Sequence, residues 1–210
     1  MYSLPDFKEK NPDVVKQFVR EHPFAFLSGC NQASKPIATQ VPVFIDEKDS
    51  KLFLTGHMMR NTDHHKAFLQ NPNVLAVFTG AHSYVSASWY ADKQQASTWN
   101  YMSVHAKGTI RFLDEAELLE VLRRTTNHFE NNPTSGSNFD DIPTDYVERL
   151  IKAIVAFEIT VEEIDNVFKL SQNRDEKSYD NIIRELRNGD GDAKRIAELM
   201  EQRKAEVFNS

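Results

Sequence analysis

The sequence predicts an α+β protein, mainly β with flanking helices, in which six or more short strands form a closed or nearly closed barrel. Three observations support this class. Apolar segments follow one another quickly between residues 24 and 112, and turns rich in Asn, Gly, Asp and Ser separate them. Helix-start signals stand in the connections between these segments. Two amphipathic helical patterns then end the chain.

The first elements follow from local signals. The pair Asn11-Pro12 is typical of a helix start and predicts a helix that ends near His22. A shorter helix is expected at 62–70, before Asn71-Pro72. The expected strands are 24–28, 37–45, 52–55, 74–79, 84–90 and 99–112, with a hairpin loop at 47–50.

The second half of the chain is expected to be more helical. Asp114 and Glu117 have the spacing of a capping box, which predicts a helix through about Phe129. The elements expected next are a polar loop at 131–141, a short helix capped by Thr144, a strand at 153–167 and, after Asp175, two helices separated by 188–192. We expect one domain over residues 1–170 and a helical extension over 171–210, packed on the same domain.

Composition limits the possible functions. Hydrophobic residues make up 40% of the 210 residues and charged residues 27%, as in an ordinary globular protein. The single cysteine, Cys30, excludes an internal disulfide and a cluster of thiol metal ligands. No secretory signal or membrane-spanning run is visible, so a cytoplasmic location without a membrane partner is expected. The net charge of −6, with dispersed Lys and Arg, disfavours direct nucleic-acid binding.

One strand has a face that suits a flat ligand. Alternation along residues 99–112 places Trp99, Tyr101, Ser103 and His105 on one face, opposite an apolar core pattern. Aromatic rings with polar tips beside a histidine can stack on and hydrogen-bond to a heteroaromatic molecule. The alternative is that these rings only cover a neighbouring loop or subunit, and this stretch alone does not decide between the two.

The segment from Thr55 to Thr62 suggests an anion site. The chain leaves a strand at Gly56 and brings Arg60 and Asn61 to the start of a helix, where free amides and an arginine can bind a phosphate. The alternative is a solvated arginine with an ordinary helix cap. His64 and His65 lack metal-ligand spacing, so we expect no metal and interpret them as solvated histidines.

A third polar segment, 168–174, is interpreted by itself as a capped turn. Hydrolase and Rossmann signatures are missing from the sequence, because it contains no GxSxG, P-loop or GxGxxG motif.

Taken together and in order, several segments resemble the PaiB-like family of FMN-binding proteins, split-barrel flavoproteins related to pyridoxamine phosphate oxidase. The matching segments are Ala38-Thr39-Gln40-Val41-Pro42, Leu54-Thr55-Gly56-His57 with Arg60-Asn61, 81–90, Thr98-Trp99-Asn100-Tyr101, Val104-His105 and Lys169-Leu170-Ser171-Gln172-Asn173. The resemblance implies a six-stranded Greek-key split barrel with C-terminal helices. It also implies a homodimer that binds FMN near the subunit interface.

The resemblance also implies roles for residues. Arg60 and Asn61 would hold the flavin phosphate, and two strand segments would border the ring. The expected cofactor-binding residues are Thr39, Gln40, Val41, Thr55, Gly56, His57, Arg60, Asn61, Tyr84, Trp99, Asn100, Tyr101, Lys169 and Gln172. The chain departs from the family at Gln40, where members often have histidine, and at positions 81, 87 and 97, where they often have proline.

The expected function is that of a dimeric FMN-binding negative transcriptional regulator, a role that comes from the resemblance alone. A flavin-dependent reductase or oxidase acting on a small molecule is the alternative, with His57 and His105 as the candidate acid or base. A flavin-free or haem-binding scaffold is a third possibility. The sequence does not determine whether the protein is an enzyme.

Overall fold

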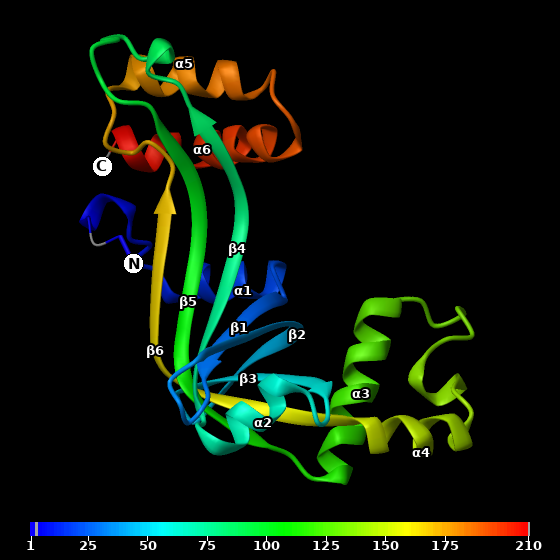
Figure 1. Ribbon diagram of the computed structural model, residues 1–210. Helices are drawn as coiled ribbons and strands as arrows, with labels where there is room; N and C mark the ends of the chain where they lie inside the picture. Colours follow the sequence, from blue (N-terminus) through cyan, green and yellow to red (C-terminus); the bar gives the residue numbers. More distant parts are fainter. Residues whose placement is uncertain (3, 210) are drawn as a thin grey trace. The chain divides into compact units, whose positions relative to one another are not determined.

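In residues 1–2 and 4–209, which the computed structural model describes, six strands and six α-helices form an α+β fold (Figure 1). The strands form a closed barrel in the order β1-β2-β3-β6-β5-β4. They are β1 (Phe24–Cys30), β2 (Pro36–Lys48), β3 (Lys51–Met59), β4 (Asn73–Val85), β5 (Thr98–Phe112) and β6 (Ile154–Lys169). The helices are α1 (Pro12–Glu21), α2 (Asp63–Gln70), α3 (Glu115–Glu130), α4 (Thr144–Ala153), α5 (Glu176–Leu186) and α6 (Gly191–Phe208), with short 3-10 turns η1 (Pro5–Phe7), η2 (Ala87–Trp89) and η3 (Phe139–Asp141).

The contacts divide the chain into two compact units. The terminal unit consists of Met1–Phe18, Thr79–Val104 and Asp165–Ser210, and the central unit of Val19–Phe78 and His105–Ile164. The expected boundary between residues 170 and 171 stays a prediction.

The central unit contains the apolar interior of the barrel. Alternate residues of its strands point inward and are buried, which is the pattern of a sheet with one covered face. These inward residues include Ala25, Leu27, Val41, Val43, Ile45, Leu54, Met58, Ala76, Phe78, Ala106, Ile110, Phe157 and Ile159. At Gly56, an added Cβ would lie 2.7 Å from the Pro42 carbonyl oxygen and 2.9 Å from the Phe157 ring. Close packing of the strands therefore requires glycine there.

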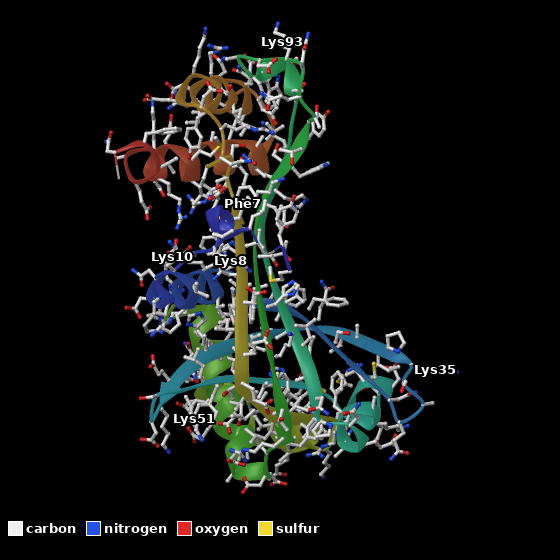
Figure 2. All side chains as sticks on the ribbon, turned by 90° about the vertical axis from the view of Figure 1, so that its left-hand side faces the viewer. Phe7, Lys8, Lys10, Lys35, Lys51 and Lys93 are labelled. Atoms are coloured by element: carbon white, nitrogen blue, oxygen red, sulfur yellow. The ribbon has the colours of Figure 1, made fainter. Side chains whose placement is uncertain are left out.

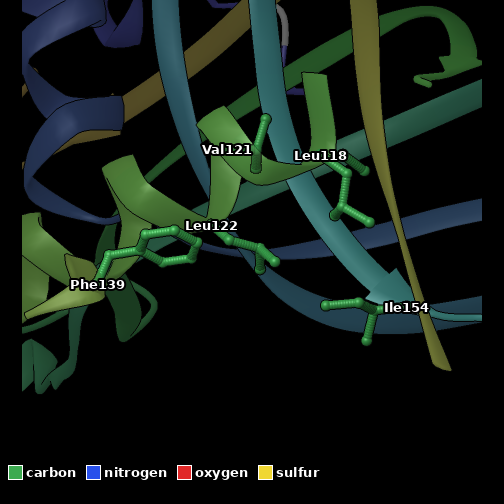
Figure 3. Packing of buried hydrophobic residues seen from close by; sticks show 6 residues of the cluster. Leu118, Val121, Leu122, Phe139 and Ile154 are labelled. Carbon is green, nitrogen blue, oxygen red and sulfur yellow. The ribbon is translucent and has the colours of Figure 1, made fainter. Parts of the chain in front are cut away.

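Two helices of the central unit pack around a second apolar cluster. Leu118, Val121 and Leu122 of α3 contact Phe139 and the start of β6 at Ile154 (Figure 3). The Asp114–Glu117 capping box that begins α3 is confirmed, because each side chain accepts a hydrogen bond from the other residue's backbone N–H. The packing fixes the rotation of α3, which decides where its polar residues lie.

In the terminal unit, α5 and α6 pack side by side (Figure 1). The fully buried Tyr179 hydroxyl donates to the Met200 carbonyl oxygen at 2.8 Å. The N-terminal segment, with Phe7 and Lys8, is also held in this unit (Figure 2). Phe7 is buried, and the Lys8 ammonium donates to the Asp165 carboxylate and to the Asn166 carbonyl. Among the helices of the described residues, none is long and apolar enough to cross a membrane.

The α+β prediction is confirmed, with differences in the details. The segment 84–90 is not a separate strand, because β4 continues through Gly80 to Val85 and the Ser86 side chain then caps the 3-10 turn η2. Thr144 is the first residue of α4 rather than its cap, a position held by Pro143. The hairpin turn between β2 and β3 is tighter than expected, with Asp49 and Ser50 both at positive φ (50° and 60°).

Candidate functional site

The corner between β3 and α2 is held together by hydrogen bonds between its backbone and the side chains of Thr62 and His65. Asn61 adopts the left-handed conformation, with φ of 63°, and its N–H donates to His65 Nδ1 at 3.2 Å. The Thr62 hydroxyl accepts from the His65 N–H at 3.3 Å and donates to the Met59 carbonyl at 3.0 Å. Since the Arg60 N–H also donates to the Ala153 carbonyl at 2.8 Å, this corner has a defined geometry.

The Arg60 side chain leaves this corner without a partner of its own. It is half-buried, and no hydrogen bond or ion pair joins its guanidinium to another residue in the described part of the chain. Its positive charge contributes, after burial, to lowering the pKa of His65. A fixed arginine with free donors at a helix start suits a phosphate monoester, which accepts two parallel N–H bonds.

His57 provides a second unsatisfied group in the central unit. It lies on β3 between the inward-facing residues Gly56 and Met58, so its ring points to the outer face of the barrel. Its Nδ1 is buried without a hydrogen-bond partner among the residues described, and burial lowers the pKa of the imidazole. A buried nitrogen of this kind is stabilised when a ligand supplies the missing hydrogen bond. Thr55 lies on the same face and is half-buried.

The β2 segment Thr39–Val41 offers backbone as well as side chains. It pairs with β1, with Gln40 opposite Phe26, whereas the register between β2 and β3 begins only at Val43 and Gly56. Residues 39–41 lie outside the β2–β3 register of the described chain. The backbone N–H and C=O groups of this segment that face away from β1 can therefore hydrogen-bond to a ligand. Gln40 is exposed, and Val41 points into the barrel.

A second group of expected cofactor residues lies in the terminal unit. Tyr84 and Trp99 are 48% and 53% exposed, and their rings meet edge to face at 5.9 Å. His82 lies 6.2 Å from Trp99, and its Nδ1 is 3.4 Å from an Asp192 carboxylate oxygen. Exposed, mutually supported rings of this kind form a stacking surface.

Asn100 lies on the other face of β5 from Trp99 and Tyr101. It is fully buried, its amide oxygen accepts from the Ser171 hydroxyl at 3.0 Å, and its amide nitrogen lies 3.5 Å from Met200 Sδ. The side chain therefore ties β5 to the C-terminal segment. In this arrangement Asn100 positions β5 from the face opposite Trp99 and Tyr101, and its amide groups are already engaged within the protein.

Lys169 and Gln172 are also engaged with the protein. The Lys169 ammonium donates to the Thr98 hydroxyl and lies 5.7 Å from the Tyr2 ring centroid. Burial lowers the pKa of this ammonium, and the positive charge of Arg174 adds to the effect. Gln172 accepts from the Leu170 N–H at 2.7 Å and donates to the Phe168 carbonyl, so it closes the turn after β6. Tyr101 is half-buried, and burial raises the pKa of its phenol.

The structure corrects the interpretation of His64 and His65 as solvated histidines. The His64 side chain is 14% exposed, and its ring nitrogens lie 2.9 Å from the Thr62 hydroxyl and 3.2 Å from an Asp63 carboxylate oxygen. His65 is 7% exposed rather than solvated, because its ring packs edge to face on Phe112 at 4.8 Å and accepts the Asn61 N–H. The sequence signal for this contact was the four-residue spacing of Asn61 and His65 across the start of a helix, which brings the two residues close together. No group of three or more His, Cys, Asp or Glu among the described residues could hold a metal ion. His105, the other candidate acid or base, is half-buried on β5.

Sequence reasoning also missed two hollows in the central unit. A groove of about 680 Å³ runs past Cys30, Lys107 and Glu163 and includes none of the expected cofactor residues. A smaller pocket of about 200 Å³ lies between Arg20, Phe44 and Arg124. Neither had a sequence signal, because each combines residues that are far apart in the chain.

Comparison with known proteins identifies the family. The family model described as "Putative FMN-binding domain" matches residues 1–163. The "Protease synthase and sporulation protein PAI 2" of Bacillus subtilis (strain 168) is 36% identical over 204 residues, which cover 97% of this chain and 98% of that protein.

Solved structures share the fold at low sequence identity. The flavocytochrome Anf3 of Azotobacter vinelandii superposes with a TM-score of 0.58 and 17% identity, covering 86% of this chain and 78% of its own. The FAD and heme binding protein of Mycobacterium smegmatis gives a TM-score of 0.51 and 12% identity, covering 77% and 73%. Because the family model spans most of the chain and the Bacillus relative matches almost end to end, the chain belongs to this PaiB-like family of FMN-binding proteins, whose cofactor is FMN.

Proposed function

We propose that this protein is a cytoplasmic homodimer that binds FMN and acts as a negative transcriptional regulator of the PaiB type. The observation that carries the FMN site is the Arg60 guanidinium, which leaves a well-ordered helix start without a partner in the described chain. The regulator role comes from the family resemblance, and the near end-to-end match to PAI 2 supports membership of that family.

In this proposal Arg60 and Asn61 hold the flavin phosphate. Arg60 supplies the charge and two parallel donors, and the left-handed Asn61 turns the chain into α2. The backbone edge of Thr39–Val41 hydrogen-bonds to the rim of the ring, and Thr55 and His57 border it. Bound FMN supplies reversible one- and two-electron redox chemistry.

His57 has a defined part in this site. Because its pKa is lowered by burial, the imidazole is neutral at neutral pH, and one ring nitrogen then carries a proton while the other can accept one. The unpartnered Nδ1 would exchange a hydrogen bond with the flavin and hold it against β3. Gly56 contributes through strand packing rather than by making room for the ligand.

The aromatic group of Tyr84, Trp99 and Tyr101 is assigned to the cofactor by the family resemblance, with Lys169 and Gln172 as further members. We keep this assignment as a separate proposal. The exposure of Trp99 and Tyr84 supports it, whereas the internal hydrogen bonds of Asn100 and Gln172 favour a positioning role for those two residues.

An exposed apolar strip on β1 supports the homodimer. Phe24 and Phe26 share one face of the strand and are 61% and 44% exposed. Phe26 pairs with Gln40 in the register, so the strip lies one strand away from the proposed flavin rim, across β2. A second copy that covers these rings would bury both them and the edge of the cofactor.

A dimer that uses this strip should weaken when a charge is placed on it. We expect light scattering after gel filtration to give a dimer mass for the natural chain and a monomer mass for Phe26→Lys. Phe129→Lys, at a ring 52% exposed on α3, is the matched control and should stay dimeric. A dimeric Phe26→Lys variant would place the interface elsewhere.

A flavin-dependent oxidoreductase is the second candidate function. The observation that favours it is the buried, unpartnered Nδ1 of His57, since perturbed histidines are common where protons move. Here the same FMN site would turn over NADH or NADPH and a small acceptor.

Titration of the purified protein with FMN tests the site itself. We expect quenching of flavin fluorescence with one FMN bound per chain, and a protein that leaves FMN fluorescence unchanged contradicts the proposal. Steady oxidation of NADH or NADPH by the loaded form would favour the oxidoreductase. Salt-dependent retardation of operator DNA would favour direct regulation, which the charge of −6 makes the less expected result.

A further inference from the structure

We propose that the central unit has a second ligand site, a pocket for a small aromatic carboxylate between α1, β2 and α3. The pocket has a volume of about 200 Å³ and is lined by Arg20, Pro23, Phe44, Arg124, His128 and the neighbouring residues of β2. None of these belongs to the proposed FMN site.

The walls of the pocket are fixed by the fold. Arg124 and His128 are four residues apart on α3 and therefore lie on the same side of the helix. The apolar residues Leu118, Val121 and Leu122 fix the rotation of this helix (Figure 3). On the other side, the Val43 N–H donates to the Pro23 carbonyl at 2.9 Å, which holds the end of α1 against β2.

An aromatic floor runs across the pocket. The Arg124 guanidinium lies over the Phe44 ring at 4.1 Å, and the His128 ring meets the same ring edge to face at 5.1 Å. The Phe44 ring thus already contacts one planar group over its face and another edge to face. A volume of about 150 Å³ suffices to bind benzene in an apolar cavity, so the pocket has room for one substituted ring.

The charge of the pocket selects an acid. Arg124 is balanced by Asp46, whose two carboxylate oxygens accept from it at 2.6 and 2.9 Å. Arg20 has no such partner: in the described part of the chain, no carboxylate is within ion-pair distance of its guanidinium. One arginine is therefore free to make a bidentate pair with a carboxylate. A ring that bears one carboxylate matches both the floor and this charge.

The test uses 4-fluorobenzoate and the FMN-saturated protein, followed by fluorine NMR. We expect saturable line broadening of the probe, weakened about tenfold in Arg20→Gln, because that variant removes the charge-assisted pair. Phe44→Leu should also weaken binding, since it keeps an apolar floor but loses the ring. The matched control is Arg187→Gln in the terminal unit, where an exposed arginine pairs with Glu201; it should bind the probe as the natural chain does.

The outcomes separate this site from the FMN site. Release of FMN by the probe, seen as a rise in flavin fluorescence, would mean that the acid occupies the cofactor site and would overturn the proposal. Unchanged broadening in Arg20→Gln, or no broadening up to millimolar probe, would overturn it as well. Binding of phenyl phosphate in place of fluorobenzoate would reject the carboxylate. If FMN does not bind, the line broadening of the probe and its loss in Arg20→Gln are measured on the FMN-free protein and still test this site.

Discussion

The two groups of expected cofactor residues differ in how the protein uses their polar atoms. In the central unit, the Arg60 guanidinium and His57 Nδ1 lack partners within the described chain. In the terminal unit, the side chains of Asn100, Lys169 and Gln172 bond to Ser171, Thr98 and backbone groups. Both groups match the same family pattern, yet the polar side chains of Asn100, Lys169 and Gln172 spend their hydrogen bonds within the protein, whereas Arg60 and His57 do not.

The difference shows what a motif can and cannot indicate. A buried polar group needs a partner, and the fold itself often provides it. A family pattern conserves both the residues that touch the ligand and those that hold them in place, and the sequence alone does not separate the two. Unsatisfied donors and acceptors in the structure separate the residues that touch the ligand from those that position them, and this distinction can be tested by mutation.

The largest effect is expected at Arg60. Replacing it with alanine removes charge-assisted hydrogen bonds to the phosphate, each worth about 1.5–3 kcal/mol, so FMN affinity should fall about a hundredfold. Fluorescence titration measures it. Because Arg60 has no partner of its own, the midpoint of urea unfolding should change little without FMN. Arg187→Ala is the control, and equal FMN affinity in Arg60→Ala would refute the phosphate assignment.

Asn100→Ala should act on stability instead. The substitution leaves the Ser171 hydroxyl buried without its acceptor and opens a small cavity, which costs about 1–3 kcal/mol of unfolding free energy. Urea unfolding followed by tryptophan fluorescence measures this loss. The nearby exposed Asn173→Ala is the control. A variant of unchanged stability that binds FMN far more weakly would show that Asn100 touches the cofactor after all.

Trp99→Ala tests whether the aromatic group contributes to the cofactor. An exposed stacking ring is worth about 0.5–1.5 kcal/mol, so we expect FMN affinity to fall about fivefold with unchanged stability. Tyr146→Ala, at a ring 48% exposed on α4, is the control. Equal affinity of Trp99→Ala and Tyr146→Ala would leave the central unit as the whole of the site.

Much of the fold could be predicted because its signals are local. The capping box of Asp114 and Glu117 and the proline at the start of α1 need only neighbouring residues, and both gave the correct helices. The end of β4 was missed because the strand continues through Gly80 to Val85, although a glycine in a local sequence commonly marks a turn or a weak strand interior.

The candidate site was predictable in its motifs but not in its roles. The sequence predicted that Arg60 lies at the start of a helix, and in the structure Arg60 lies just before the start of α2. The partners of Asn100 lie 71 and 100 residues away, so the sequence could not reveal that its amide is engaged. The burial of His65 likewise depends on Phe112, on a distant strand.

The smallest expected effect comes from the histidines of the central unit. Burial holds the pKa of His57 and of His65 below the ordinary value of 6.5, so the unfolded chain binds protons at a higher pH than the folded one. Their contribution to stability is therefore complete above about pH 6.5 and is lost as the pH falls below it. Urea unfolding at pH 7.5 and 5.5 should show lower stability at pH 5.5.

The variant His57→Gln should reduce this difference in stability, because glutamine does not titrate. Bound FMN should also reduce the difference if it hydrogen-bonds to His57 Nδ1. If neither His57→Gln nor FMN changes this pH dependence, His57 Nδ1 does not serve the ligand. The contrast between the two regions would then rest on Arg60 alone.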